Sequence, residues 1–162
     1  MNAGKVTLTL PAPTAASTQA IAARLAGECR VGDCILLFGD LGAGKTTFAR
    51  GFIRARCPGE EEVVSPTFTL VQTYAPEKGA AIWHFDIYRL KNNKELDELG
   101  LQDALASGIV LIEWPELAQS ELPEDALSVT ISVAGRPEHR LLTFSGCRVA
   151  WQTRLAGLQS DE

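Results

Sequence analysis

The expected fold of this chain follows from residues Gly39-Asp40-Leu41-Gly42-Ala43-Gly44-Lys45-Thr46. These residues fit the pattern G-x-x-x-x-G-K-[ST] at every fixed position. Glycines at this spacing let successive backbone N–H groups point inward around a polyphosphate, which then lies at the positive end of the following helix. In such a loop Lys45 is expected to reach the β- and γ-phosphates, and Thr46 is expected to bind magnesium. The eight residues therefore predict a P-loop.

The segments on either side of the loop support this interpretation. Residues 34–38 (CILLF) form a continuous apolar run whose length suits a strand covered on both faces. After the loop, residues 46–56 place Phe48 and Phe52 on one side of a helix. A buried strand that leads into the loop and an amphipathic helix that leaves it are the context that phosphate binding requires.

The rest of the sequence mixes strand-like and helix-like patterns. Alternation at residues 6–10 predicts a strand that Pro11 and Pro13 end, and a helix is expected from about Thr14 or Ser17. The further expected elements are antiparallel hairpins at 68–74 with 80–86 and at 126–133 with 140–144, a helix at 93–105, a buried strand at 108–113 and a short closing tail. We therefore expect one α/β domain over residues 1–162, similar to P-loop NTPases, with a central mixed, mostly parallel sheet that is flanked by helices and extended by antiparallel hairpins.

Composition limits the class of protein. With 162 residues, 46% hydrophobic and 22% charged, the chain suits one ordinary globular core. The formal net charge of −5 argues against a general basic surface that grips nucleic acid, so we expect a partner to hold any RNA. The four cysteines form no C-x-x-C pair, which indicates reduced thiols and no zinc site. Because no apolar run approaches about 18 residues, we expect a cytoplasmic protein that does not enter the membrane.

Magnesium-dependent nucleotide chemistry also needs a carboxylate at the end of a neighbouring strand. Two residues qualify, because Glu113 follows the apolar run 109–112 and Asp86 ends the strand expected at 80–86. Either acid can hold a metal-bound water or orient the attacking one, and the sequence leaves that assignment open. His84 lies close by in the sequence and fits a structural role or a catalytic one.

Two further patterns bear on which nucleotide is bound. Asp97-Glu98-Leu99-Gly100 matches the D-x-x-G of GTPases, but it lies in an expected helix and not at the end of a strand. Asn93-Lys94 is similar to the start of the guanine-reading N-K-x-D, yet Leu96 occupies the fourth position and offers no carboxylate. These departures favour adenine over guanine.

Taken together, four ordered motifs resemble the TsaE family, also known as YjeE. The motifs are residues 39–47, Ser65-Pro66-Thr67-Phe68-Thr69-Leu70, His84-Phe85-Asp86-Ile87-Tyr88-Arg89-Leu90 and Ile112-Glu113-Trp114-Pro115-Glu116. The resemblance covers roughly residues 8–133, and its last three motifs are more specific to the family than the P-loop.

The resemblance implies an ATPase that binds ATP or ADP with Mg2+ and works with the proteins TsaB and TsaD. In that family the three subunits make the threonylcarbamoyl modification of the adenosine beside the anticodon of tRNA. TsaD carries the transfer chemistry, so this chain would meet tRNA only through the complex. Its hydrolysis is expected to be weak alone and stimulated by the partners.

The resemblance also implies roles for individual residues. Lys45, Asp86 and Glu113 are the expected catalytic residues, with Asp86 helping to position or activate water, and Thr46 and Glu113 are expected to hold the magnesium. The expected nucleotide contacts are Asp40, Leu41, Gly42, Ala43, Gly44, Lys45, Thr46, Thr47, Thr67 and Trp114. Among these, Thr47 would hold the α-phosphate and Thr67 matches a switch-like threonine. No motif matches after Gly135, so the roles of Trp151 and Arg154 stay open.

Two other functions fit the same P-loop. A small-molecule kinase usually closes an arginine-bearing lid over its acceptor, and only Arg89 lies near the motifs, without a long lid insertion. In the second alternative, the chain is a nucleotide-dependent binding switch without significant hydrolysis, in which ATP and ADP set the shape of residues 65–70 for a partner.

Overall fold

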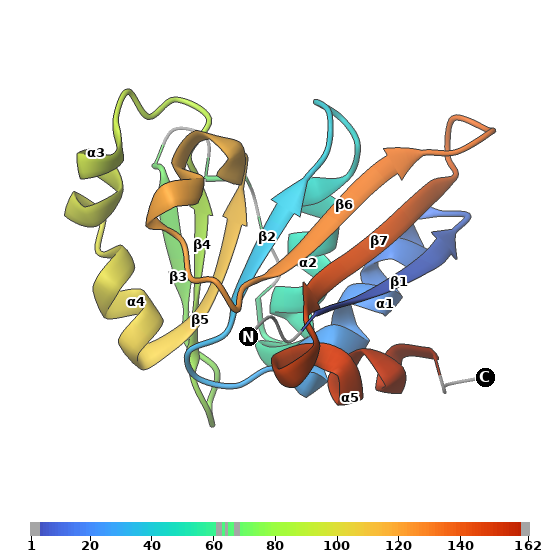
Figure 1. Ribbon diagram of the computed structural model, residues 1–162, viewed down its shortest axis with the longest axis horizontal. Helices are drawn as coiled ribbons and strands as arrows, with labels where there is room; N and C mark the ends of the chain where they lie inside the picture. Colours follow the sequence, from blue (N-terminus) through green and yellow to red (C-terminus); the bar gives the residue numbers. More distant parts are fainter. Residues whose placement is uncertain (1–3, 61–62, 64, 67–68, 160–162) are drawn as a thin grey trace.

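The computed structural model describes residues 4–60, 63, 65–66 and 69–159. In this part of the chain, seven strands form one sheet in the order β1-β7-β6-β2-β5-β4-β3, with helices on both faces (Figure 1). The elements are β1 (Lys5–Ala12), α1 (Ala15–Glu28), β2 (Cys34–Phe38), α2 (Lys45–Arg56), β3 (Val71–Tyr74), β4 (Ala81–Asp86), α3 (Asn93–Glu98), α4 (Leu101–Ser107), β5 (Gly108–Glu113), the 3-10 helix η1 (Pro115–Glu121), β6 (Leu127–Val133), β7 (Arg140–Cys147) and α5 (Arg148–Gln159).

The centre of the sheet is parallel and both of its edges are antiparallel. Strand β2 pairs in parallel with β5 and β6, and β4 pairs in parallel with β5. The antiparallel pairs are β3 with β4 at one edge, and β6 with β7 and β7 with β1 at the other. This arrangement confirms the expected α/β fold and both hairpins, while "mostly parallel" applies only to the four central strands.

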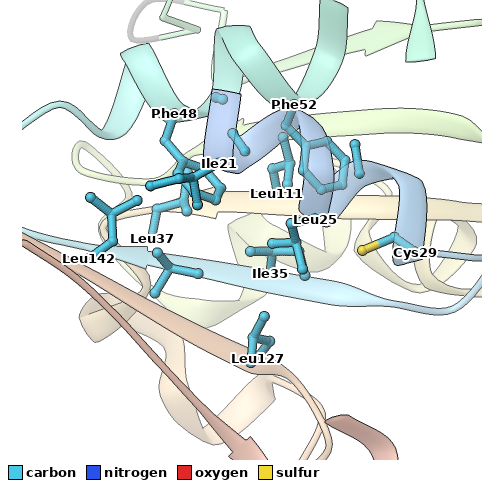
Figure 2. Close-up of a cluster of buried hydrophobic side chains, with 14 of the residues drawn as sticks. Ile21, Leu25, Cys29, Ile35, Leu37, Phe48, Phe52, Leu111, Leu127 and Leu142 are labelled. Atoms are coloured by element: carbon cyan, nitrogen blue, oxygen red, sulfur yellow. The ribbon is translucent and has the colours of Figure 1, made fainter. Parts of the chain in front are cut away.

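Alternating side chains of the central strands separate two hydrophobic cores. Ile35 and Leu37 of β2 point to the larger core under α1 and α2, whereas Cys34 and Leu36 point to the smaller core beside α3 and α4. Figure 2 shows part of the larger core, where Phe52 of α2 lies among side chains from α1 and the sheet. Since β2 is covered on both faces, its entire run is apolar, as the sequence predicts.

Helix α1 and strand β1 begin as the sequence predicts but differ at their junction. Thr14 caps α1, and its hydroxyl accepts a hydrogen bond from the backbone N–H of Ser17 at 3.1 Å. The expectation that Pro11 ends β1 is wrong, because the strand continues through Pro11 to Ala12, but Pro13 directly follows the last residue of the strand, as expected. Pro11 fits within the strand since β1 is an edge strand, where a missing N–H on the open side breaks no hydrogen bond of the sheet.

Two helical segments also differ from the expectation. The helix expected at 93–105 is divided into α3 and α4, because Gly100 between them has a φ of 94°, a left-handed conformation that interrupts a helix. The expected short tail is instead helix α5, which packs against β7, β1 and α1 (Figure 1).

Buried polar contacts hold α5 in place. Trp151 is buried, and its Nε1 donates to the backbone carbonyl of Asp125 at 2.7 Å. The Arg154 guanidinium pairs with the Asp33 carboxylate and donates to the carbonyl of Glu28 at 3.2 Å. Trp151 and Arg154 thus stabilise the fold at a distance from the P-loop.

The cysteines and the lengths of the helices agree with the expectations from composition. All four cysteines, Cys29, Cys34, Cys57 and Cys147, are free thiols. Among the helices of the residues given above, none combines the length and the apolar character needed to cross a membrane.

The contact between α1 and α2 leads to a stability prediction. A Cβ atom at Gly51 of α2 would lie 2.5 Å from the Gln19 carbonyl oxygen, so Gly51→Ala forces the two helices apart. We expect a loss of about 1–3 kcal/mol in the free energy of unfolding, measured by urea denaturation.

Gly27→Ala is the matched control, because Gly27 lies in α1 with no atom within 4 Å of an added Cβ. Alanine favours a helix over glycine, so this variant should gain up to about 1 kcal/mol. Equal stability of the two variants would contradict the predicted helix contact.

Candidate functional site

The P-loop connects β2 to α2 and depends on glycine for its shape. Gly42 and Gly44 have φ values of 80° and 117°, which side-chain-bearing residues rarely adopt. At Gly39 the backbone runs so close to β6 that an added Cβ would lie 2.7 Å from the Ile131 carbonyl oxygen. The pattern of glycines read from the sequence is therefore a steric requirement of this loop.

Lys45 begins α2 and folds back over the loop. Its Nζ donates to the carbonyl oxygens of Gly39 at 2.5 Å and Asp40 at 3.0 Å, and lies 3.8 Å from the ring centroid of Trp114. Burial lowers the pKa of Lys45, and the nearby carboxylates, Glu113 first among them, act in the opposite direction. The ammonium group thus lies inside the loop, among groups that favour its positive charge.

The two candidate carboxylates lie side by side. Asp86 and Glu113 are register partners at the ends of the parallel strands β4 and β5, and each is only 3% exposed. The Thr46 hydroxyl of α2 lies 3.2 Å from Oε1 and 3.1 Å from Oε2 of Glu113, to which it donates. Three separate elements therefore meet at the carboxyl ends of the parallel strands, where ligands of open α/β sheets bind.

Asp86 is held by its own set of donors. Its Oδ1 accepts from the backbone N–H of Tyr88 at 3.1 Å, and its Oδ2 accepts from the Ser65 hydroxyl at 3.0 Å. Ser65 belongs to the segment between α2 and β3 that contains the expected switch residue Thr67, which lies outside the described residues. Asp86 thereby links this segment to the end of β4.

A pocket of about 470 Å³ opens between these groups, and it is the main pocket of the site because the P-loop and both carboxylates line it. Nine of its lining residues were expected from the sequence: Leu41, Gly42, Gly44, Lys45, Thr46, Thr47, Asp86, Glu113 and Trp114. Ser65, Tyr88 and Arg89 complete the lining. Trp114 has a φ of 63°, an unusual backbone conformation for a bulky residue, and its ring packs on Tyr88 at a centroid distance of 4.7 Å.

Asp40 and Ala43, also expected as nucleotide contacts, lie on other sides of the loop. Both line a groove beside β6, and Ala43 also lines a second cavity of about 240 Å³. Thr18 and Thr47 face this second cavity, as do Glu138 and Arg140. The Arg140 Nε donates to the Ala43 carbonyl at 2.6 Å and so ties β7 to the P-loop.

Sequence reasoning missed Thr18, Glu138 and Arg140, and it left His84 undecided. The first three belong to α1 and the β6–β7 hairpin, far from the loop in sequence and outside any motif. His84 is completely buried, and its Nε2 lies 2.7 Å from Oε2 of Glu113. His84 had two signals in the sequence, its place in the third family motif and its alternation with Asp86 along β4.

The donor set suits a hard cation in combination with phosphate. Thr46 and Glu113 offer oxygen atoms, which are the ligands that Mg2+ prefers. Across the described part of the chain, no three His, Cys, Asp or Glu side chains gather into a metal-binding group.

The parallel strand order, the loop between β2 and α2 and the acids at the neighbouring strand ends define an α/β protein of the P-loop NTPase-like class. A sequence model of the family described as "Threonylcarbamoyl adenosine biosynthesis protein TsaE" matches residues 12–141. The chain belongs to the TsaE family.

Individual relatives agree with this assignment. The Bacillus subtilis "tRNA threonylcarbamoyladenosine biosynthesis protein TsaE" is 40% identical over 130 residues, which cover 79% of this chain and 78% of the relative. The protein of the same name from Rickettsia felis is 41% identical over 116 residues, or 72% of this chain and 67% of the relative. The crystal structure of Bacillus subtilis YdiB superposes with a TM-score of 0.81 at 30% identity and covers 96% of both chains.

The close approach at Gly39 gives a prediction about the loop itself. In Gly39→Ala, the methyl group meets the Ile131 carbonyl and displaces the loop from β6, so we expect a loss of about 1–3 kcal/mol in the free energy of unfolding. Urea denaturation measures the change.

Gly135→Ala provides the control, because Gly135 also has a positive φ, of 79°, but open space around it. It should lose less stability than Gly39→Ala. A cost at Gly39 no greater than at Gly135 would show that the contact with β6 does not constrain the loop.

Proposed function

We propose that this chain is the Mg2+-dependent, ATP-binding and ATP-hydrolysing subunit of a bacterial complex that makes N6-threonylcarbamoyladenosine in tRNA, acting with TsaB and TsaD. The observation that carries the proposal is the hydrogen bonding of Thr46, the last P-loop residue, to Glu113 at the end of a different strand. A loop that only capped a helix would need neither this acid nor Asp86 beside it.

The loop supplies groups for the phosphates of ATP. Backbone N–H groups at the start of α2 are unsatisfied by the helix itself and favour an anion. Lys45 donates to two loop carbonyls in this structure, and it would transfer these hydrogen bonds to β- and γ-phosphate oxygens when ATP binds. Thr47 lies in the next position of the helix and lines both cavities, so it suits the α-phosphate between them.

Thr46 and Glu113 would hold the magnesium. When bound, Mg2+ would neutralise charge on the phosphate oxygens and so favour breakage of the bond between the γ-phosphorus and the oxygen that joins it to the β-phosphate. The protein's contribution is to keep the hydroxyl and the carboxylate in one place, which the backbone of β5 and the first turn of α2 do together.

Asp86 would orient the attacking water. Its carboxylate lies beside Glu113, accepts hydrogen bonds from Tyr88 and Ser65, and faces the main pocket. A carboxylate so fixed can accept a proton from water and direct its lone pair toward the γ-phosphate. The catalytic residues of the proposal are therefore Lys45, Asp86 and Glu113.

The nucleoside would occupy the second cavity. Thr47 is shared by the two cavities, so a chain of phosphates that ends at Glu113 leaves its nucleoside on the side of Thr18 and Arg140. The choice of adenine depends on the sequence, in which the guanine-reading motif lacks its carboxylate.

Exposed apolar side chains beside the main pocket support a protein partner. Leu41 at the tip of the loop is 89% exposed, and Tyr88 is 57% exposed. Large apolar side chains of this kind gain stability when another protein covers them. A partner at this edge would lie over the phosphates and could stimulate their hydrolysis.

The central experiment is phosphate release from ATP with Mg2+, measured for the purified chain alone and with TsaB and TsaD. We expect weak release alone and clear stimulation by the partners, with both lost in Lys45→Ala. Nucleotide binding without phosphate release in either setting would contradict the ATPase.

One contact favours a second candidate, a nucleotide-dependent binding switch. The hydrogen bond from Ser65 to Asp86 lets the site influence the segment before β3 without any hydrolysis. In that case the affinity for TsaB and TsaD would differ between ATP and ADP, while no phosphate would be released.

Thr46→Ala and Glu113→Gln test the proposed metal site. Each removes one oxygen that holds the magnesium, so partner-stimulated phosphate release should fall by about 10²- to 10³-fold. Glu98→Gln on the exposed face of α3 is the control for Glu113 and should keep the full rate. Wild-type turnover in both site variants, with folding verified by circular dichroism, would refute the assigned roles.

Asp86→Asn tests the proposed role in orienting water. The amide keeps the size of the side chain but is a poor base, so kcat should fall by about 10²-fold or more. The affinity for ADP should stay close to that of the wild type, because Asp86 is not expected to contact the phosphates. Asp97→Asn on the exposed side of α3 is the control and should change neither quantity. If the affinity of Asp86→Asn for ADP falls as much as its kcat, Asp86 acts in binding and not in orienting water.

A further inference from the structure

His84 is completely buried in the sheet beside the main pocket, and its Nε2 lies 2.7 Å from Oε2 of Glu113. We infer that His84 is a positioning residue that fixes the Glu113 carboxylate in the orientation needed for magnesium. This inference rests on the proposed function, in which Glu113 holds the metal.

The strand register brings the two side chains together. Along β4, His84 and Asp86 share one face, while Phe85 between them points to the opposite core. His84 is opposite Leu111 of β5, and Glu113 follows Leu111 on the same face. The Glu113 side chain must therefore span an offset of two residues to contact His84. The longer side chain of glutamate suits this distance better than that of aspartate.

The hydrogen bonds assign the donor. A carboxylate only accepts, so the Nε2–H of His84 and the hydroxyl of Thr46 both donate to Glu113. Oε2 receives both of these hydrogen bonds, whereas Oε1 receives only the one from Thr46. The carboxylate is thus held from two sides, by β4 and by α2.

Within the described part of the chain, no second polar contact explains the burial of His84. Its Nδ1 is buried and has no hydrogen-bond partner among the residues that the structure describes. A buried imidazole with an unpaired nitrogen costs free energy, and an apolar side chain would fill the same space without that cost. The hydrogen bond to Glu113 is therefore the feature of His84 that an apolar residue cannot replace.

A carboxylate fixed in this way should bind metal more tightly. The glutamate side chain has several rotatable bonds, and a metal that must select one rotamer loses affinity when that rotamer is not held in advance. Partners that orient metal ligands in other proteins typically contribute about 10- to 100-fold to metal affinity. Since the phosphates contact the P-loop and not His84, binding of ADP without metal should be independent of it.

The experiment compares ADP binding to the full chain with Mg2+ and with EDTA by isothermal titration calorimetry. The ratio of the two Kd values is the magnesium gain. His84→Leu is expected to lower this gain by about 10- to 100-fold while leaving the Kd in EDTA unchanged. A purely structural role would weaken both titrations alike.

His84→Gln and His84→Asn are the matched pair. The glutamine amide can extend to Glu113 and donate, so it should restore most of the gain, whereas the shorter asparagine amide should not. If His84→Leu fails to fold by circular dichroism, this pair makes the comparison alone, and equal gains for Gln and Asn would overturn the inference.

A test in the Glu113→Gln background shows whether His84 acts through Glu113. In that background, His84→Leu should cause no further loss of ADP affinity in the presence of Mg2+. A further loss would overturn the inference. If the wild-type chain shows a magnesium gain and His84→Leu retains all of it, the inference about His84 is wrong while the proposed function stands. A wild-type chain without any magnesium gain would overturn the magnesium site of the proposed function and this inference with it.

Discussion

The contact between Thr46 and Glu113 brings together the two halves of the site. One residue begins α2 and the other ends β5, and their side-chain oxygens approach to 3.1 Å. This contact is possible only because β2 and β5 are parallel neighbours, so that the P-loop leaving β2 passes over the end of β5. The apolar faces of α1 and α2 hold the helix against the sheet and thereby keep Thr46 at this position.

The site concentrates polar groups that are costly to bury. Of the buried polar and charged side chains in the described chain, Lys45, His84, Asp86 and Glu113 all lie at the carboxyl end of the parallel strands. Each has a hydrogen-bond partner, and Lys45 lies among carboxylates that oppose the effect of burial on its pKa. Such groups stabilise a fold less than apolar residues of the same size would, so a functional reason for them is expected.

Family membership and local geometry answer different questions about this chain. The TsaE family model covers residues 12–141 and links the chain to relatives named for threonylcarbamoyladenosine biosynthesis. The geometry addresses chemistry, because it places a lysine, a hydroxyl and two carboxylates around one pocket. Thr46 and Glu113 line that pocket and are expected to touch the ligand, whereas His84 contacts Glu113 and is expected to orient it.

Local patterns of glycine and apolar residues were enough to predict the P-loop, the strand before it, the helix after it and both antiparallel hairpins. They also predicted that Asp86 and Glu113 end strands. The folded chain was needed to see that these strands are neighbours in register, that His84 bonds to Glu113, and that Arg140 of β7 supports the loop through Ala43. Helix α5 likewise depends on packing against β7, β1 and α1, whereas the break between α3 and α4 lies at Gly100, whose left-handed backbone is a local feature. Strand pairing and side-chain contacts join residues far apart in the chain, and a single sequence carries no periodic signal for such contacts.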